Sequence, residues 1–202
     1  MIRFIALLVT LTMPAAAFAA ERGDAAAGKQ IATKICAACH GIDGNSPLST
    51  NPNLAGQHAD YLYKQLAEYK SGARPNAIML GMIVSLSEQD MRNVSAYYSG
   101  QTAKQGMAVD VGLAMTGQQL YRAGIAEKGV AACSACHSPD GSGIPPQYPS
   151  VSGQHAEYTA AQLRAFRAGS RDNDINAMMR TVASRLSDEE IKALAEYISG
   201  LH

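Results

Sequence analysis

The chain has 202 residues, with 17 basic and 17 acidic side chains and a formal net charge of zero at pH 7. A chain without a basic surplus lacks the electrostatic attraction on which nucleic-acid binding depends, so no nucleic-acid partner is expected. The four cysteines leave three options open at this point, because disulfides, zinc sites and covalent cofactors all use this residue.

The first element is a short apolar segment at the N-terminus. Arg3 supplies a positive start, residues 4–13 are apolar apart from two threonines, and Ala17-Phe18-Ala19 places small residues around a larger one. This pattern is typical of a secretory signal peptide and predicts cleavage after Ala19. The apolar run is short for a membrane span, which needs about 20 residues. We therefore expect residues 1–19 to be removed and the mature chain to be exported, with an uncleaved membrane anchor as the alternative.

The remainder of the chain contains an internal repeat. Residues 36–72 recur 97 positions later, and residues 86–100 recur 100 positions later. Such a repeat predicts two related domains, which we place at residues 20–106 and 107–202 with a connector over 101–112. The most informative matches pair Cys36, Cys39, His40, Pro52, Gly56, Gln57 and His58 with Cys133, Cys136, His137, Pro149, Gly153, Gln154 and His155.

Each copy is predicted to consist of helices and loops, which gives an all-α fold class. Asp24 is expected to cap a helix that runs over 25–34 into the first cysteine motif, and the equivalent helix of the second copy is expected to open near Thr116. Residues 61–70 and 158–168 contain no glycine or proline and predict a middle helix in each copy.

The last helix of each copy has the clearest signals. Ser87 with Asp90, and Ser187 with Glu190, fit a capping box, in which two side chains satisfy free backbone amides at a helix start. An apolar stripe at helical spacing follows in both copies and predicts a buried helix face. Its members are Met91, Val94, Tyr98, Ile191, Leu194 and Ile198. The Gly- and Pro-containing loops 41–58 and 138–155 are too long for ordinary connections, and such loops usually wrap around something.

The cysteine motifs decide what the loops enclose. Cys36-Ala-Ala-Cys39-His40 and Cys133-Ser-Ala-Cys136-His137 both have the form Cys-x-x-Cys-His, the attachment motif of c-type haem. Cysteines three apart on a helical turn can reach the two vinyl groups of one porphyrin, and the following histidine can then bind the iron. Two motifs use all four cysteines, so two covalent haem c groups are expected rather than zinc or disulfides. A bound haem would also supply the apolar interior that a domain of about 90 residues lacks.

Each iron needs a sixth ligand, and the repeat selects one methionine per copy. Met79 and Met179 both lie seven residues before the Leu-Ser pair that opens the last helix. Met82 and Met178 match Val182 and Ile78 and are expected to be core residues. We therefore predict His40 with Met79, and His137 with Met179, as the axial ligands.

Two further repeated pairs lie near these motifs. Pro52 and Pro149 are candidates to accept a hydrogen bond from the haem-binding histidine through their carbonyls, since such histidines usually donate their second ring N–H to a fixed acceptor. His58 and His155 are alternative axial ligands, but they follow the motif histidines by only 18 residues. We expect them instead to cap the middle helices or to lie near the haem edge.

These features resemble the class I c-type cytochromes, and the tandem arrangement with Gly-Gln-His-Ala in each copy resembles the periplasmic dihaem cytochrome c4 family. The resemblance covers essentially the whole mature chain. It implies two helical domains with their haems facing one another, a periplasmic location, and electron delivery to a terminal oxidase, often of the cbb3 type. A cytochrome bc1-type or similar complex is the implied donor, and peripheral association with the membrane is left open. The haem attachment and axial residues that the resemblance implies are those derived above.

A methionine opposite histidine is typical of electron carriers, because it raises the reduction potential and closes the iron to substrate. We therefore expect an electron-transfer protein that is not an enzyme and has no small-molecule substrate. Two alternatives remain. One is a dihaem peroxidase-like enzyme, which needs an open iron and acid–base residues. The other is a haem-bearing oxidase subunit that keeps the N-terminal segment as a membrane anchor.

Overall fold

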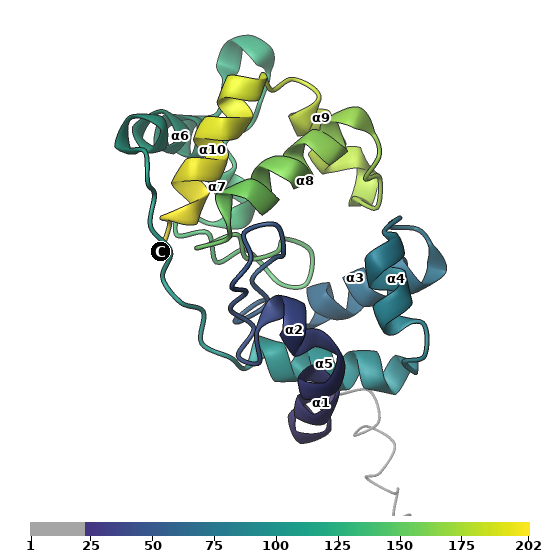
Figure 1. Cartoon of the computed structure of the whole chain (residues 1–202). Coiled ribbons are helices and arrows are strands. Elements are labelled where there is room, and N and C mark those ends of the chain that lie inside the picture. Colours follow the sequence, from purple (N-terminus) through teal and green to yellow (C-terminus); the bar gives the residue numbers. More distant parts are fainter. Residues whose placement is uncertain (1–22) are drawn as a thin grey trace, which may run out of the picture.

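The computed structural model describes residues 23–202, so the predicted signal peptide, residues 1–19, lies outside the described residues. The chain forms two helical halves stacked end to end and joined by an extended connector (Figure 1). The first half contains α1 (Ala25–Ile31), a π-helical turn (Ala32–Cys36), α2 (Ala37–His40), α3 (Ala59–Ser71), α4 (Ala77–Ile83) and α5 (Glu88–Ser99). The second contains α6 (Val111–Ala123), a 3-10 turn (Ala126–Lys128), α7 (Ser134–His137), α8 (Ala156–Ala168), a 3-10 turn (Ile175–Ala177), α9 (Met178–Ala183) and α10 (Asp188–Ser199).

The helix starts follow the capping signals in the sequence. The Asp24 carboxylate accepts a hydrogen bond of 2.8 Å from the backbone N–H of Ala26 and so caps α1. Both predicted capping boxes are present, at the start of α5 and at the start of α10. Outside the helices, residues 23–202 pair as β-bridges at only two isolated positions. The all-α prediction is therefore confirmed.

The predicted start of the first helix in the second half is wrong. The sequence places it near Thr116, but α6 begins at Val111, and the Asp110 carboxylate accepts a 3.0 Å hydrogen bond from the backbone N–H of Leu113. Gly112 and Gly117 are residues typical of a connector, but the structure places both inside α6. One of them, Gly117, is buried and is required for helix packing.

The first and last helices of each half cross at a glycine. A Cβ atom at Gly28 of α1 would lie 2.0 Å from the Asn93 carbonyl oxygen of α5, and a Cβ atom at Gly117 of α6 would lie 2.0 Å from the Ala193 oxygen of α10. Real Cβ atoms do not approach an oxygen so closely, so each crossing requires a residue without a side chain. The same close crossing in both halves reflects their common origin by duplication.

The Gly117→Ala variant is expected to unfold more easily than the natural protein. The added methyl group must push α6 away from α10, at a cost of about 2 kcal/mol after the better helix propensity of alanine is counted. Urea unfolding of the haem-loaded protein measures this loss. Gly112→Ala in the same helix is the matched control, because its Cβ meets only the Asp110 carboxylate, at 3.4 Å. An equal loss in both variants would contradict a role for the crossing.

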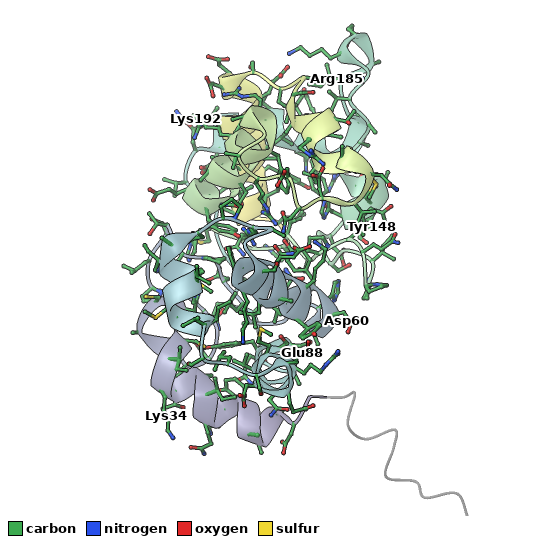
Figure 2. The ribbon with its side chains drawn as sticks, turned by 90° about the vertical axis from the view of Figure 1, so that its right-hand side faces the viewer. Lys34, Asp60, Glu88, Tyr148, Arg185 and Lys192 are labelled. Atoms are coloured by element: carbon green, nitrogen blue, oxygen red, sulfur yellow. The ribbon has the colours of Figure 1, made fainter. Side chains whose placement is uncertain are left out.

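The apolar stripe of the last helices forms the core of each half. All six predicted stripe residues are buried, with exposed fractions of 0% to 6%. The predicted long loop of each half runs at the centre of the molecule, where it meets the loop of the other half (Figure 1). Figure 2 shows the stack from the side, with Lys34 near one end, Arg185 and Lys192 at the other, and Tyr148 near the junction.

Within residues 23–202 no helix combines the length and apolar character needed to cross a membrane.

Candidate functional site

The two Cys-x-x-Cys-His motifs lie at the end of a helical segment in each half. Cys36 ends the π-helical turn, and Cys39 lies in the single turn of α2. In the second half Cys133 directly precedes α7, which contains Cys136. None of the four cysteines forms a disulfide. Burial raises the pKa of the Cys36 thiol to about 11, and a hydrogen bond with Tyr98 offsets only part of this rise. Burial also raises the pKa of the Cys133 thiol to about 11.

A zinc site is not supported by this arrangement. In the part of the chain that the structure describes, no three His, Cys, Asp or Glu side chains are grouped so that they could hold a metal ion. A zinc site needs four ligands around one point, usually thiolates and imidazoles. The Cys36 and Cys133 thiols are instead neutral groups that line a largely apolar cavity, which suits the addition of a thiol to a vinyl group.

Each motif histidine is held by the proline that the sequence indicated. The Nδ1 atom of His40 lies 3.0 Å from the carbonyl oxygen of Pro52, and Nδ1 of His137 lies 2.9 Å from that of Pro149. Because a carbonyl oxygen can only accept, Nδ1 carries the hydrogen and Nε2 keeps its lone pair. Burial lowers the pKa of both histidines, and the bond to proline offsets this only in part. Both rings are therefore neutral near pH 7 and present Nε2 as a metal ligand.

A tyrosine fixes the backbone just after each histidine, but it comes from a different helix in each half. The Tyr98 hydroxyl of α5 donates to the Gly41 carbonyl at 3.2 Å, and the Tyr121 hydroxyl of α6 donates to the Ser138 carbonyl at 2.7 Å. Both tyrosines are buried. When the crossing glycines Gly28 and Gly117 are aligned, Tyr121 matches position 32, which is alanine. The two halves thus fill the same space from opposite helices, and a residue-by-residue comparison of the copies does not detect this.

Both motifs open into one continuous cavity of about 780 Å³ between the helices and loops. The cavity is lined by the four cysteines, both motif histidines, both prolines and many aliphatic side chains from the two halves. The aliphatic residues include Leu62, Ile83, Leu86, Val94, Leu163, Val182, Leu186 and Leu194. His58 and His155 do not line it. They occupy the first position before α3 and α8, although neither side chain caps its helix. The cavity therefore provides two apolar sites, each with two thiols and one imidazole.

Four methionines line the same cavity. Met79 lies in α4 and packs against the buried cluster of Ile83, Leu86 and Met91. Met179 lies in α9 and is half-buried. Met82 and Met178 also line the cavity. The expectation that Met82 is a core residue is wrong, because its side chain is 47% exposed. The Met178 sulfur lies 4.0 Å from the Tyr148 hydroxyl. The preference for Met79 and Met179 therefore still depends on the repeat.

Asp174 anchors the segment that carries Met179. Its carboxylate accepts a 2.9 Å hydrogen bond from the Arg180 backbone N–H and a 2.7 Å bond from the Arg180 Nε. Asn176 and Ala177, between the two partners, have positive φ angles of 53° and 54°, which residues with a side chain rarely adopt. Burial alone raises the pKa of Asp174, but the hydrogen bonds from Arg180 outweigh it and hold the pKa below its usual value of 3.8.

Because the folded-state pKa of Asp174 is depressed, its stabilising effect is present above pH 3.8 and is lost as the pH falls through the folded-state value. We expect Asp174→Asn to lower the stability of the haem-loaded protein at pH 7 by about 1 kcal/mol, since Arg180 is partly exposed. The difference from the natural protein should shrink below about pH 4. Unfolding midpoints measured from pH 7 to pH 3 test this. A difference that stays constant over this range would contradict it.

Two buried arginines link the halves at the cavity wall. Arg74 donates to the Tyr158 hydroxyl at 3.1 Å and to the side-chain Oε1 of Gln162 at 2.8 Å in the second half. Arg171 donates to the Tyr61 hydroxyl and to the side-chain Oε1 of Gln65 in the first half, both at 3.1 Å. Both arginines line the cavity and recur at the offset of 97. The site predicted from the sequence did not include them, although their repetition was a signal that could have identified them.

The arginine side chains also test whether the cavity fits haem. Arg74 and Arg171 are 6% and 7% exposed, and neither forms an ion pair with a carboxylate of residues 23–202. A buried cation without an anionic partner is costly. Each haem carries two carboxylates on an otherwise apolar ring, so an occupant of this kind suits both the aliphatic walls and the two buried guanidinium groups.

Comparison with known proteins agrees with this geometry. The cytochrome c family model matches residues 25–100 and 114–202. Cytochrome c4 of Stutzerimonas stutzeri is 46% identical over 98% of each chain, and a thiosulfate dehydrogenase electron acceptor of the A1501 strain of that species is 37% identical over 95% of this chain and 90% of its own.

A solved structure supports the same assignment. The crystal structure of reduced recombinant cytochrome c4 from Pseudomonas stutzeri superposes with a TM-score of 0.86, at 45% identity, over 89% of this chain and 100% of that chain. Its agreement extends across both halves, so the tandem arrangement is shared as well as the single domain. The chain is thus a member of the cytochrome c4 family, with two tandem cytochrome c domains and two covalently bound haem c groups.

Proposed function

We propose that this dihaem electron-transfer protein works in the periplasm, where it carries electrons to a terminal oxidase of the cbb3 type. It is not an enzyme and has no small-molecule substrate. The proposed donor is a cytochrome bc1-type or similar complex. The relative named as a thiosulfate dehydrogenase electron acceptor supports a second class of donor, a dehydrogenase. The proposed domains are residues 20–106 and 107–202, and the signal peptide is cleaved after Ala19.

Each half contributes one set of haem-binding residues to this proposal. Cys36 and Cys39 attach one haem, and Cys133 and Cys136 attach the other. The axial ligands are His40 with Met79 in the first half and His137 with Met179 in the second. When bound, each haem supplies one-electron exchange between ferrous and ferric iron.

One observation carries this assignment more than any other. Both motif histidines have Nδ1 fixed by a proline carbonyl, at 3.0 Å and 2.9 Å, and both are neutral and line a cavity that they share with the repeated methionines. This arrangement leaves Nε2 as the free imidazole nitrogen in each half. An imidazole and a thioether would together hold each iron, which would leave no position for a substrate.

Residues of the protein hold each haem-binding site rigid while an electron is exchanged. The prolines fix the histidine rings, Tyr98 and Tyr121 fix the backbone behind them, and Arg74 and Arg171 place positive charge at the wall where the two sites meet. A rigid site with mainly apolar walls rearranges little when the charge of the iron changes, and electron transfer is then fast. The guanidinium groups also offset the negative charge of the haem carboxylates.

The first experiment is the visible spectrum of the reduced protein before and after addition of carbon monoxide. An electron carrier with two closed irons should show no change. Met79→Leu should open one iron and shift the main haem band of one haem per chain, whereas Met82→Leu should behave like the natural protein. A shift in the unmodified protein would favour a peroxidase-like enzyme. N-terminal sequencing of the mature chain separately tests cleavage after Ala19 against a retained membrane anchor.

A further inference from the structure

Two glutamines join the halves beside the haem-binding histidines. Gln57 and Gln154 occupy the same position in the repeat, and both line the central cavity. Each follows a glycine whose backbone N–H donates to the last helix of its own half, from Gly56 to the Tyr98 carbonyl and from Gly153 to the Ile198 carbonyl, both at 3.1 Å. The glutamines are therefore held by their own half while their side chains reach the other.

The side chain of Gln154 binds the residue that follows Pro52. Its Oε1 atom accepts a 2.8 Å hydrogen bond from the Asn53 N–H, and its Nε2 atom donates a 3.0 Å bond to the Asn53 carbonyl. Gln57 does the same to Ser150, with an Oε1 bond of 3.0 Å and an Nε2 bond of 2.7 Å. Both backbone partners are satisfied only when the amide has this orientation, which fixes the assignment of its oxygen and nitrogen.

The bonded N–H belongs to the peptide group that holds the histidine. The Pro52 carbonyl accepts from His40 Nδ1 at 3.0 Å, and the N–H of the same peptide group, on Asn53, donates to Gln154 Oε1 at 2.8 Å. Hydrogen bonds in such a chain polarise one another, so the glutamine makes the proline carbonyl a stronger acceptor. It also prevents the peptide group from rotating away from the imidazole.

We propose that Gln57 and Gln154 are positioning residues that each act on the haem histidine of the opposite half. Gln154 acts on His40 through the Pro52–Asn53 peptide group, and Gln57 acts on His137 through the Pro149–Ser150 peptide group. This inference rests on the proposed function, because it takes both histidines as axial ligands. Its consequence is that each iron senses whether the other half is docked against its own.

The direction of the effect follows from the donor strength of the histidine. A strong hydrogen bond from Nδ1–H gives the imidazole more negative charge and favours ferric iron, which lowers the reduction potential. Removing the Gln154 amide weakens that bond, so the potential of the haem in the first half should rise. The haem of the second half should keep its potential, although Gln154 belongs to the second half.

The test is a redox titration of haem-loaded Gln154→Met and Gln57→Met variants, followed by NMR of the shifted haem methyl signals. A Met79→His variant assigns one set of signals to the first half. Gln154→Met should raise the potential of the first haem alone, and Gln57→Met that of the second alone. Ser49→Ala is the matched control, because it removes a cross-half hydrogen bond, from Ser49 Oγ to Glu157 Oε2, and contacts neither proline peptide group.

A second readout is the Nδ1–H proton of the axial histidines in the reduced protein labelled with [15N]histidine. Gln154→Met should move the His40 signal upfield and leave that of His137 in place. If Gln154→Met does not retain both haems, Gln154→Asn shortens the side chain without removing the amide and is read in the same way. Equal shifts of both haems, a shift only in the variant's own half, or no shift would overturn the inference.

The unmodified protein separates this inference from the proposed function. If its ferric spectrum lacks the absorption band of methionine-ligated haem, the axial assignment fails before any glutamine variant is measured. If the band is present and the crossed pattern of potentials is absent, the assignment stands and the role of the glutamines is wrong.

Discussion

The variant with both Cys133 and Cys136 replaced by alanine will carry one covalent haem instead of two, and its second half will lose most of its helical structure. The cavity shared by the two sites measures about 780 Å³. Half of that volume, at about 24 cal/mol per Å³ of cavity, corresponds to roughly 9 kcal/mol. This is comparable to the whole stability of a small domain, about 5–15 kcal/mol. An empty second site therefore leaves α6 to α10 without an adequate core.

Mass spectrometry of the intact chain counts the attached haems, and far-ultraviolet circular dichroism measures the lost helix. The single variant Cys133→Ala is the control, because the thioether at Cys136 should still hold the haem in place and preserve the fold. Two haems on the double variant would show that the second motif is not the attachment site. A fully helical double variant with one haem would show that the second core does not depend on its haem.

The Met79→His variant will keep both haems, while the reduction potential of the first haem falls. Nitrogen from histidine stabilises ferric iron better than the thioether of methionine does. We expect a decrease on the order of 0.2 V, a fraction of the ~0.8 V over which axial ligands set haem potentials. A potentiometric titration followed by visible absorbance measures this decrease.

Met82→His is the matched control for the same helix. Met82 lines the cavity from α4 but has no methionine partner in the repeat, so its replacement should leave both potentials unchanged. If Met82→His lowered the potential and Met79→His did not, the repeat would have selected the wrong methionine.

Local patterns in the sequence predicted most of the fold. The cap at Asp24, both capping boxes and the apolar stripe depend on residues within a few positions of each other, and the structure confirms all of them. The start of α6 was missed because a glycine at a close helix crossing cannot be distinguished, from sequence alone, from a glycine in a connector. Gly117 is required because it packs against the Ala193 carbonyl, which lies 76 residues later in the sequence.

The candidate site was predictable only where one half suffices to define it. The cysteine motifs and the hydrogen bonds from His40 and His137 to the prolines each lie within a single half, and the repeat indicated them. The roles of Gln57, Gln154 and the buried arginines arise only where the halves meet. No periodicity or spacing within one half specifies that contact, although the repetition of these residues marked them as candidates.

The contacts between the halves are reciprocal: Gln57 binds Ser150 while Gln154 binds Asn53, and Arg74 reaches Gln162 while Arg171 reaches Gln65. Such a self-complementary interface is the geometry of a symmetric homodimer, here built inside a single polypeptide. Fusion of the two subunits allows one copy to change without the other. Lys64 and Glu68 have alanine at the matching positions 161 and 165, and they bind Asn173 across the interface. A dimer of identical subunits would carry such charges in both subunits or in neither. In the fused chain they lie in one half only, so the surroundings of its two irons can become unequal.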